Sequence, residues 1–515
     1  MKKKLTVLAV LLALAFTLGA CGGGGGGGYN AENIYVSLYI GGVGREWLDE
    51  LAAEYNETHD GADVVVQPGK TEYATIRDEL RAGTSKVDVY FSDVVQLEEL
   101  VYLDLLADIS DIMDDKIGEE NESILEKMSD SQKKFYNFGT ESEPVYYALP
   151  YQETPCGIVY DHDLFSTRGF LDGGPGPDGK TGTVDDGLPQ TYDDFKELLR
   201  TLAQSGVTPF AWTSEYEFYT GFVLRSIWAQ YEGVNDFDLN YTFEGTDEQL
   251  GKITPQTGWK LFQQEGLHQA LKFVEECMIP EGYATEGSFK RTSHTVTQDR
   301  FILSELTDTP TAMIMTGSWW ENESKGTFLS AYKEYGTRDF RLLPLPKFDG
   351  QKGYKEDGTG SAFFNWNDNT AIFVNKQTKH LDDVKEFLKF MHTDYALSKF
   401  TVATNCLRAL DYSLTEDQYK QLTKFGQNVW TLAKESDNIE IVGKNSRSPL
   451  INFTSPMLDN YRFDATINGA PYSWPASAMH DDTTITADIY WQGIQTKYSE
   501  AQWATIYDSV KNYFS

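Results

Sequence analysis

The stretch IYVSLYIGGVGREWLDELAAEYNE, residues 34–57, decides the fold that we expect. Its first seven residues, 34–40, are mostly β-branched or aromatic and predict a strand. The sequence GGVG at 41–44 predicts a tight turn. From Glu46 to Glu57, apolar residues recur at the three- and four-residue spacing of one helix face. A strand, a glycine turn and a helix in succession indicate the first unit of a layered α/β fold.

Strand and helix patterns continue to alternate downstream. Residues 64–66 and 87–91 predict two further strands, and residues 71–82 between them predict a helix. Helices are also expected from Tyr192 to about Ser205, over 395–400 and over 417–434. This alternation favours an α/β fold with mainly parallel strands. Ligands of such folds bind beyond the carboxyl ends of strands, which points to the turns after Ile40 and Phe91.

Residues 170–189, FLDGGPGPDGKTGTVDDGLP, interrupt this pattern because Gly, Asp and Pro dominate them. Such a composition predicts a loop. Asp178, Asp185 and Asp186 stand in it among glycines, and hard oxygen ligands on a turning loop suit Ca²⁺. The spacing differs from that of an EF-hand, so an ordinary acidic surface loop is the alternative. A structural Ca²⁺ is the one cofactor considered, and none is required.

The first 28 residues are typical of an export signal. Three lysines precede an apolar segment over 5–18, which is followed by LGAC at 18–21 and by seven glycines. About 14 apolar residues are too few to span a hydrocarbon core about 30 Å thick, so the segment is a secretory signal rather than a membrane helix. Small residues before Cys21 resemble the lipobox of bacterial lipoproteins. The resemblance implies a signal peptide over 1–20, lipid on Cys21 and a flexible tether over 21–29. An ordinary cleaved signal with a chance cysteine is the alternative.

The composition limits the possible partners. The chain has 78 Asp and Glu against 44 Lys and Arg, a formal net charge of −34. This charge repels nucleic acid and anionic lipid headgroups and favours a neutral or cationic ligand. If Cys21 carries lipid, Cys156, Cys277 and Cys406 remain, an odd number that fits neither a disulfide framework nor a zinc motif. They are expected to be small core residues.

Six segments carry a resemblance to a known family. They are YVSLYIGGVGREWLDELAAEYNE at 35–57, VDVYFSDVVQLEELVYLDLLADIS at 87–110, YALPYQETPCGIVYDHDLF at 147–165, TAMIMTGSWWENES at 311–324, FRLLPLPKFDG at 340–350 and TAIFVNKQTKHLDDVKEFLKFM at 370–391. In this order and at these intervals they resemble the carbohydrate-binding solute receptors of ABC importers, the family with the maltose-binding-protein architecture. The resemblance covers most of residues 30–515.

The resemblance implies a two-lobed, type II periplasmic-binding-protein-like fold with a hinge and a ligand cleft between the lobes. The first lobe is expected over 30–148 and about 361–404, and the second over 149–360 and about 405–515. Loop 170–189 and the long carboxyl-terminal part depart from the family pattern, which leaves the lobe boundaries and the ligand size open.

The implied function is capture, without catalysis, of a di- or oligosaccharide and its delivery to permease subunits that work with a cytoplasmic ATPase. The expected state is a monomer, anchored by lipid at the extracellular face of the bacterial cytoplasmic membrane. No nucleic acid partner is expected.

Sugar recognition needs aromatic planes that stack on sugar rings and polar groups that pair with hydroxyls. The sequence GSWWENE supplies both, with Trp319, Trp320 and Glu321 at the end of an apolar strand. Neighbours in an extended strand face opposite ways, so one of the two tryptophans should face the cleft and the other the core. The resemblance favours Trp319.

Further ligand-binding candidates lie near expected strand ends or crossings between lobes. Each has an alternative role in the core, in a turn or as a helix cap. They are Trp212, Tyr216 and Tyr219 in an aromatic-rich loop, Trp366 and Asn367 before an expected strand, Asp93 after the third strand, Gly41 and Gly42 for close backbone approach, Tyr151 and Glu153 at the expected crossing, Arg408 after a polar turn, and Trp474.

Two other functions compete with the receptor. A surface-anchored glycoside hydrolase would need two carboxylates across the scissile bond, and 78 acidic residues leave room for such a pair. No recognisable motif marks one. A surface adhesin or scaffold is disfavoured because the chain contains no repeats and no low-complexity stalk beyond the glycines.

Overall fold

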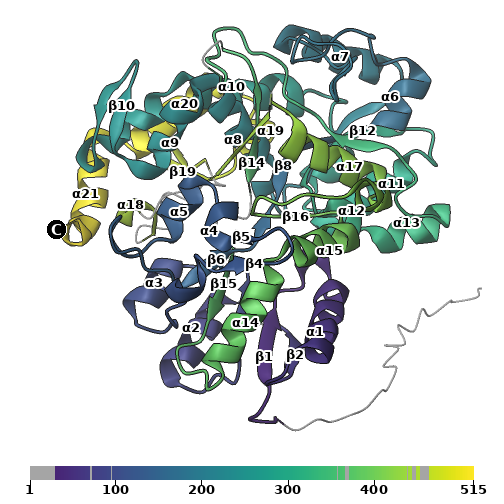
Figure 1. The fold of residues 1–515 in the computed structure, drawn as a ribbon. Coiled ribbons are helices and arrows are strands. Elements are labelled where there is room, and N and C mark those ends of the chain that lie inside the picture. The colour runs from purple at the N-terminus through teal and green to yellow at the C-terminus, as the bar shows by residue number, and fades with distance from the viewer. Residues whose placement is uncertain are drawn as a thin grey trace, which may run out of the picture.

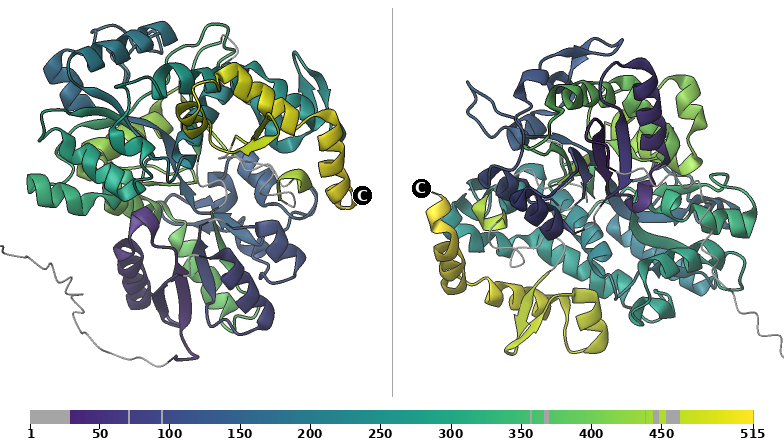
Figure 2. Two further views of the ribbon diagram at one scale, coloured as in Figure 1. Left: turned by 180° about the vertical axis from the view of Figure 1, so that it is seen from behind. Right: turned by 90° about the horizontal axis from the view of Figure 1, so that it is seen from below.

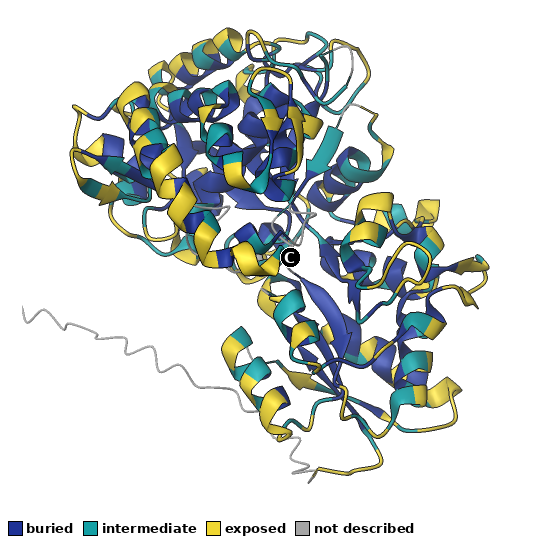
Figure 3. Cartoon of the chain, turned by 90° about the vertical axis from the view of Figure 1, so that its left-hand side faces the viewer, coloured by how far each residue is buried: buried dark blue, intermediate teal, exposed yellow. Residues whose placement is uncertain are grey.

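The computed structural model describes residues 29–514, apart from 70–71, 94, 356–357, 366–369, 438, 444–447 and 453–462. The chain forms two lobes, each with a sheet covered by helices (Figure 1). Buried residues fill the interior of both lobes, and exposed residues lie on the outer helix faces (Figure 3). Among the described residues, no helix has both the length and the apolar character needed to cross a bilayer.

The first lobe has a five-stranded sheet in the order β2-β1-β3-β15-β6. Its strands are β1 (Ile34–Leu38), β2 (Val64–Pro68), β3 (Val89–Ser92), β6 (Ala148–Pro150) and β15 (Ala371–Val374). β1 is parallel to β2 and β3, as the alternating pattern predicts. β15 is antiparallel to β3 and to β6. The prediction of mainly parallel strands is therefore wrong for this half of the sheet, because β15 reaches it from far along the chain.

The second lobe has a mixed sheet in the order β17-β14-β8-β12-β9, with β13 also paired to β8. Its strands are β8 (Pro155–Asp161), β9 (Thr208–Ala211), β12 (Thr311–Gly317), β13 (Phe340–Leu342), β14 (Ser361–Asn365) and β17 (Ile439–Val442). β8 is antiparallel to β12, β13 and β14. All residues of β8 and β12 are buried, which fits central strands covered on both faces.

The chain crosses between the lobes three times. β7 (Gln152–Glu153) joins β6 to β8, the chain passes again from β14 in the second lobe to β15 in the first, and β16 (Leu407–Arg408) follows the last helix of the first lobe. β7 and β16 pair with each other, so two of the crossings form a small sheet between the lobes. Because β14 still belongs to the second sheet, the return to the first lobe comes after Asn365, slightly later than the predicted 361.

The helices follow from capping residues and amphipathic patterns. The first lobe has α1 (Glu46–Thr58), α2 (Tyr73–Ala82), α3 (Leu97–Tyr102), α4 (Ile124–Lys127), α5 (Asp130–Tyr136), α14 (Leu381–Met391) and α15 (Asp394–Thr404). The second has α6 (His162–Arg168), α7 (Tyr192–Gln204), α8 (Phe218–Glu232), α9 (Val234–Thr242), α10 (Glu265–Phe273), α11 (His294–Ser304), α12 (Trp320–Glu323), α13 (Lys325–Tyr332), α16 (Glu416–Gln421) and α17 (Lys424–Trp430). α7 begins at a capping box formed by Thr191 and Asp194, and its apolar side faces the core. The stretch predicted as one helix over 417–434 is divided, because Thr423 caps a new helix.

The carboxyl-terminal part packs along the second lobe (Figure 2). It contains α18 (Pro449–Asn452), the hairpin β18 (Ala465–Ile467) and β19 (Ala470–Tyr472), α19 (Pro475–Asp481), α20 (Ala487–Lys497) and α21 (Glu500–Val510). Tyr490 and Trp503 of this part are buried in the same core as β8 and β12. The segment is therefore an integral part of the second lobe.

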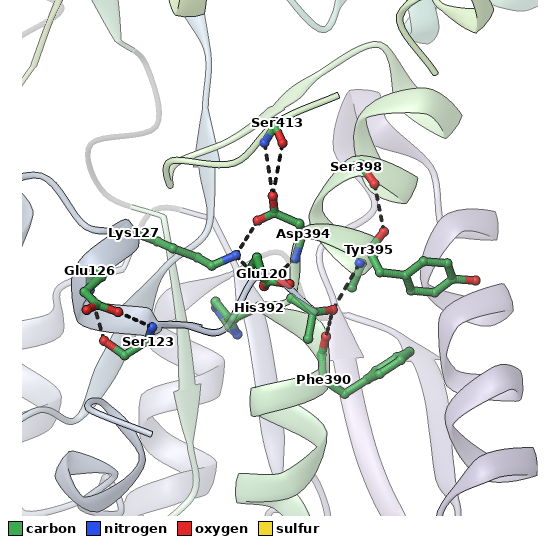
Figure 4. A network of polar contacts seen from close by, with 12 residues as sticks. Glu120, Ser123, Glu126, Lys127, Phe390, His392, Asp394, Tyr395, Ser398 and Ser413 are labelled. Carbon is green, nitrogen blue, oxygen red and sulfur yellow. Dashed lines mark hydrogen bonds and ion pairs between the residues drawn. The ribbon is translucent and has the colours of Figure 1, made fainter. Parts of the chain in front are cut away.

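A buried ammonium group ties the third crossing to the first lobe (Figure 4). The side chain of Lys127 is fully buried, and its Nζ lies 2.7 Å from Glu120 and also contacts Asp394. Asp394 in turn accepts hydrogen bonds from the amide and hydroxyl of Ser413 at 3.3 Å. This network fixes the chain directly after β16.

Candidate ligand-binding site

A pocket of about 220 Å³ lies between the lobes, next to the crossings. The first lobe and the crossing line it with Tyr39, Gly41, Gly42, Val43, Asp93, Tyr151, Gln152 and Thr370, and the second lobe lines it with Tyr216, Phe218, Tyr219, His294, Trp319 and Glu323. The residues after β1, β3 and β12 meet here, at the carboxyl ends of strands from both sheets. The expected placement after Ile40 and Phe91 therefore agrees with the position of the pocket.

The two lobes touch at the edge of this pocket. The turn η1 (Gly41–Val43) follows β1, and the α12 residue Asn322 donates from Nδ2 to the carbonyl of Gly42 at 2.6 Å. Gly42 packs directly against Trp319, and a Cβ added to Gly42 would lie 2.7 Å from Trp319 Cδ1. Gly42 is therefore a position of close approach between the lobes, as well as part of the pocket lining.

Of the tryptophan pair, Trp319 lines the pocket and Trp320 lies in the core. Trp319 is partly exposed, and its ring centroid is 6.1 Å from that of Tyr219. Trp320 is fully buried among Phe301, Phe340 and other rings. The two side chains diverge because Trp319 is in a turn and Trp320 begins α12, so the extended-strand reasoning does not apply.

Aromatic side chains from the second lobe form one side of the pocket, which we call the aromatic wall (Tyr216, Phe218, Tyr219 and His294). The rings of Tyr219 and His294 are stacked at 5.7 Å, and Tyr216 meets His294 edge-on at 5.0 Å. Trp212, from the same predicted loop, is instead buried against Phe289 at 5.0 Å and does not line the pocket.

Both hydrogen-bond donors and hydrogen-bond acceptors line the pocket. Asp93 and Glu323 line it from opposite lobes and supply acceptor oxygens. Glu323 Oε2 accepts a hydrogen bond from Gln298 at 3.0 Å, and its other oxygen lies 3.8 Å from His294 Nε2. Burial and the nearby Asp93 and Glu323 carboxylates raise the pKa of Tyr39, so its hydroxyl stays protonated and can donate. The pocket thus combines ring faces, donors and acceptors.

The floor of the pocket is formed at the small sheet between the lobes. Tyr151 lines the pocket, and Arg408 lies beneath it, fully buried, with its Nε donating to the Tyr151 carbonyl at 2.8 Å. The Arg408 guanidinium lies over the rings of Tyr151 and Phe400 at 5.5 and 5.7 Å, and burial lowers its pKa to about 10. Glu153 is bound to Lys434 at 2.8 Å. Arg408 and Glu153 therefore brace the crossings and, contrary to expectation, do not line the pocket.

Glu321 also lies away from the pocket. Its side chain is buried in the second lobe, where Oε2 accepts a hydrogen bond from the Thr423 hydroxyl at 2.5 Å. Burial raises the pKa of Glu321 to about 7. Trp366, Asn367 and Cys21 are outside the described residues.

The three loop aspartates take part in local hydrogen bonds. Asp185 accepts from the amide of Asp178 at 2.8 Å, and Asp186 accepts from the amide of Gly182 at 2.7 Å. Within the described part of the chain, the carboxylates close enough to share an ion are instead Glu232, Asp236 and Asp247, whose oxygens lie within 4.8 Å of one another. The ammonium of Lys352 contacts this group and supplies positive charge there.

Sequence reasoning missed several residues that line the pocket. They are Tyr39, Val43, Gln152, Phe218, His294, Glu323 and Thr370. Glu323 follows the GSWW sequence, and the short helix α12 carries it back to the pocket, whereas the buried Glu321 faces the core. His294 begins α11 far from any recognised motif, so no sequence signal indicated it.

Comparisons with known proteins agree with this architecture. No curated protein matches the chain in sequence. Among solved structures, the chain is similar to RafE in complex with raffinose, a protein of Streptococcus pneumoniae (14% identity, 92% of this chain and 99% of that one, TM-score 0.55). It is also similar to a structure from work on xylan utilization by Caldanaerobius polysaccharolyticus (13% identity, 90% of this chain and 99% of that one, TM-score 0.58). A third similar structure is the Thermus thermophilus maltotriose binding protein bound with maltotriose (16% identity, 91% of this chain and 100% of that one, TM-score 0.54).

At these identities the likeness shows a shared two-lobed fold. The family itself is shown by a sequence model described as bacterial extracellular solute-binding protein, which matches residues 50–427. The chain belongs to the bacterial extracellular solute-binding proteins.

Proposed function

We propose that the chain is the sugar-binding component of an ABC importer and captures a di- or oligosaccharide between its lobes. The observation that carries this proposal is the composition of the pocket. Trp319 and the aromatic wall offer flat apolar faces, and Asp93, Glu323 and Tyr39 offer hydrogen-bonding groups beside them. Stacking on ring faces together with precisely placed polar partners is what sugar rings require. The similar structures bound to raffinose and maltotriose support the same ligand class.

The crossings support a mechanism by hinge closure. The pocket walls come from two lobes that are joined at the β7–β16 sheet, so rotation there separates or joins the walls. A ligand favours the closed form only by the contacts that it makes there in addition to those in the open form. A sugar that touches both Asp93 and Trp319 gains such contacts.

The charges of the pocket favour a neutral or cationic sugar over an acidic one. Of the described residues that line it, the fixed charges belong to Asp93 and Glu323, and both are negative. A uronic acid would place a third carboxylate in the same partly desolvated space, where like charges repel strongly. The net charge of −34 acts in the same direction at longer range.

The proposal includes an anchor and partners. Lipid on Cys21 would hold a monomeric receptor at the outer face of the cytoplasmic membrane, and the glycine tether would let it turn toward permease subunits served by a cytoplasmic ATPase. Mass spectrometry of the membrane fraction tests the anchor, because a lipid-sized mass increase on the peptide beginning at Cys21 is expected and is absent after Cys21→Ala.

Calorimetric titration of the soluble chain from residue 29 tests the binding function. The panel contains raffinose, maltotriose, xylotriose, deacetylated and acetylated chitotriose, and galacturonic acid trimer. We expect saturable binding to at least one neutral or cationic member and none to the acidic one. Response only to amino acids, peptides or metals would refute the sugar assignment.

Two controls sharpen the result. Trp319→Ala should weaken binding by about tenfold or more, on the scale of 1–3 kcal/mol for an aromatic contact. Trp491→Ala, which removes a half-buried tryptophan stacked on His268 in the same lobe, should leave affinity unchanged. Chromatography of the sugar after incubation tests the hydrolase alternative, since shortened products would exclude a pure receptor.

A further inference from the structure

One acidic residue, Glu217, lies in the segment that carries three residues of the aromatic wall but does not itself line the pocket. Tyr216, Phe218 and Tyr219 face the pocket, whereas Glu217 between them is 1% exposed. Its backbone carbonyl accepts hydrogen bonds from the amide and hydroxyl of Thr220 at 2.9 and 2.7 Å, which forms the turn that begins α8. Glu217 therefore belongs to the same rigid turn as the pocket aromatics.

The carboxylate of Glu217 is bound by the carboxyl-terminal part of the chain. Oε1 accepts from the amide of Ala476 at 2.7 Å, and Oε2 accepts from the amide of Ser477 at 3.1 Å and from the Ser477 hydroxyl. Hydrogen bonds to an ionised acceptor are about twice as strong as neutral ones. A buried carboxylate with both oxygens occupied resists displacement, because any movement leaves a buried charge unpaired.

A second contact joins the same two regions. The ring of His480, on α19, stacks on Phe289 at 3.7 Å. Phe289 ends the turn η5 (Glu286–Phe289), and the carbonyl of Ser288 in that turn accepts from the amide of Ser214 at 2.9 Å. α19 thus reaches the loop before the aromatic wall along a path independent of Glu217.

We infer that the carboxyl-terminal segment 463–514, which lies outside the family match, is a working part of the ligand site, with Glu217 as the positioning residue through which it fixes the aromatic wall. The functional part of this inference rests on the proposed sugar binding. Without the Glu217 contacts, the turn at 216–219 loses the carboxylate that links it to α19, and the ligand must order the rings at a cost to its own affinity.

The contact between Glu217 and α19 also depends on the protonation of the Glu217 carboxyl group. Burial raises the pKa of Glu217 to about 7, although the donors on Ser477 and Ala476 oppose the shift. Asp481 on α19 also raises it, and His294 faces the neighbouring rings of Tyr216 and Tyr219. The raised pKa means that the buried carboxyl binds a proton more tightly than a solvent-exposed one. Protonation therefore favours the contact, and the wall should be more firmly fixed below pH 7 than above it.

Hydrogen–deuterium exchange on the unliganded protein tests the link without any sugar. Glu217→Gln replaces one acceptor oxygen with a donor that faces Ser477, and we expect amides in 213–219 and 475–481 to exchange about tenfold faster. Glu321→Gln is the matched control, because Glu321 is equally buried in the same lobe with a pKa of similar value but contacts Thr423 instead. It should leave both segments unchanged. Ser477→Ala removes one hydroxyl donor with little change of volume, and its smaller effect in the same segments decides the matter if Glu217→Gln does not fold.

Affinity and its pH profile test the functional part, with the panel sugar that binds the unaltered protein most tightly. Glu217→Gln should weaken binding about tenfold at pH 6 and flatten the loss of affinity that the unaltered protein shows between pH 6 and pH 8. Because the two proteins differ at this residue alone, the difference between the profiles reports Glu217. Unchanged exchange in 213–219 in both variants, or faster exchange with affinity within twofold, would overturn the inference. If no panel sugar binds the unaltered protein, the proposed function fails, and the exchange result alone decides whether the segment positions the pocket.

Discussion

A methyl group on Gly42 should act as a wedge between the lobes. Gly42 does not have the positive φ that disfavours side chains, so alanine fits its backbone. The obstacle is Trp319 of the other lobe, whose Cδ1, Cβ and Cγ would lie 2.7, 2.9 and 3.0 Å from the new Cβ. Because Trp319 Cβ is fixed to the backbone, rotation of the indole cannot relieve the contact. Opening of the hinge can.

The magnitude follows from the steric cost of the closed form. Overpacking at a closed contact costs about 1–3 kcal/mol. The hydrogen bond from Asn322 to the Gly42 carbonyl, at 2.6 Å, favours the closed form of both proteins and so does not change this difference. Gly42→Ala should therefore shift the balance toward the open form by about 2 kcal/mol and weaken sugar binding roughly 30-fold.

Calorimetry measures the affinity, and small-angle X-ray scattering of the unliganded protein measures the opening as an increased radius of gyration. Gly326→Ala is the control, since Gly326 in α13 has no atoms of other residues within 4 Å of a new Cβ. It should change neither quantity. Wild-type affinity and an unchanged radius of gyration for Gly42→Ala would show that the contact at Gly42 does not govern closure.

Three further predictions concern stability. Lys127→Met leaves the carboxylates of Glu120 and Asp394 without their ammonium partner and should lower the free energy of unfolding by about 3 kcal/mol in urea titration. Lys116→Met, at an exposed pair, should cost less than about 1 kcal/mol, and similar values for both would contradict this. The folded-state pKa of Glu321, about 7, lies above its unfolded value, so its contribution to stability is complete below about pH 4.5 and is lost as pH rises through 7. Glu321→Gln should therefore remove about 3 kcal/mol of the decline in the free energy of unfolding between pH 5 and pH 8. An unaltered pH dependence of the unfolding free energy would refute this assignment. If loop 170–189 holds Ca²⁺, EDTA should lower the Tm and added Ca²⁺ should restore it. An unchanged Tm would contradict a Ca²⁺ site in this loop.

The fold could be predicted to the extent that it depends on local pattern. The strand at 34–40, the helix at 46–57 and the loop at 170–189 are all confirmed, because period, turn residues and composition act within a few residues. The mixed sheets could not be predicted in the same way. The place of β15 between β3 and β6 depends on a return of the chain from the second lobe. The four residues of β15 do not indicate which strands lie beside it.

The site could be predicted only where position along a strand was sufficient. Asp93 and Trp319 follow strands and reach the pocket, as expected from their place in the chain. Trp212 has the same kind of place but fills the core, because an aromatic side chain gains as much from burial as from a ligand face. Arg408 illustrates the reverse case, since a charged residue was expected at the surface of the cleft and is fully buried beneath it.

The interior place of β15 has a consequence for how the molecule is made. β15 separates β3 from β6, so the first sheet lacks a central strand until Val374 has been synthesised. The second lobe likewise waits for Trp503 and its neighbours near the end of the chain. Contacts between such distant residues form slowly, since long loops must close first. A chain whose two lobes both depend on its last third completes neither lobe until most of it has been synthesised.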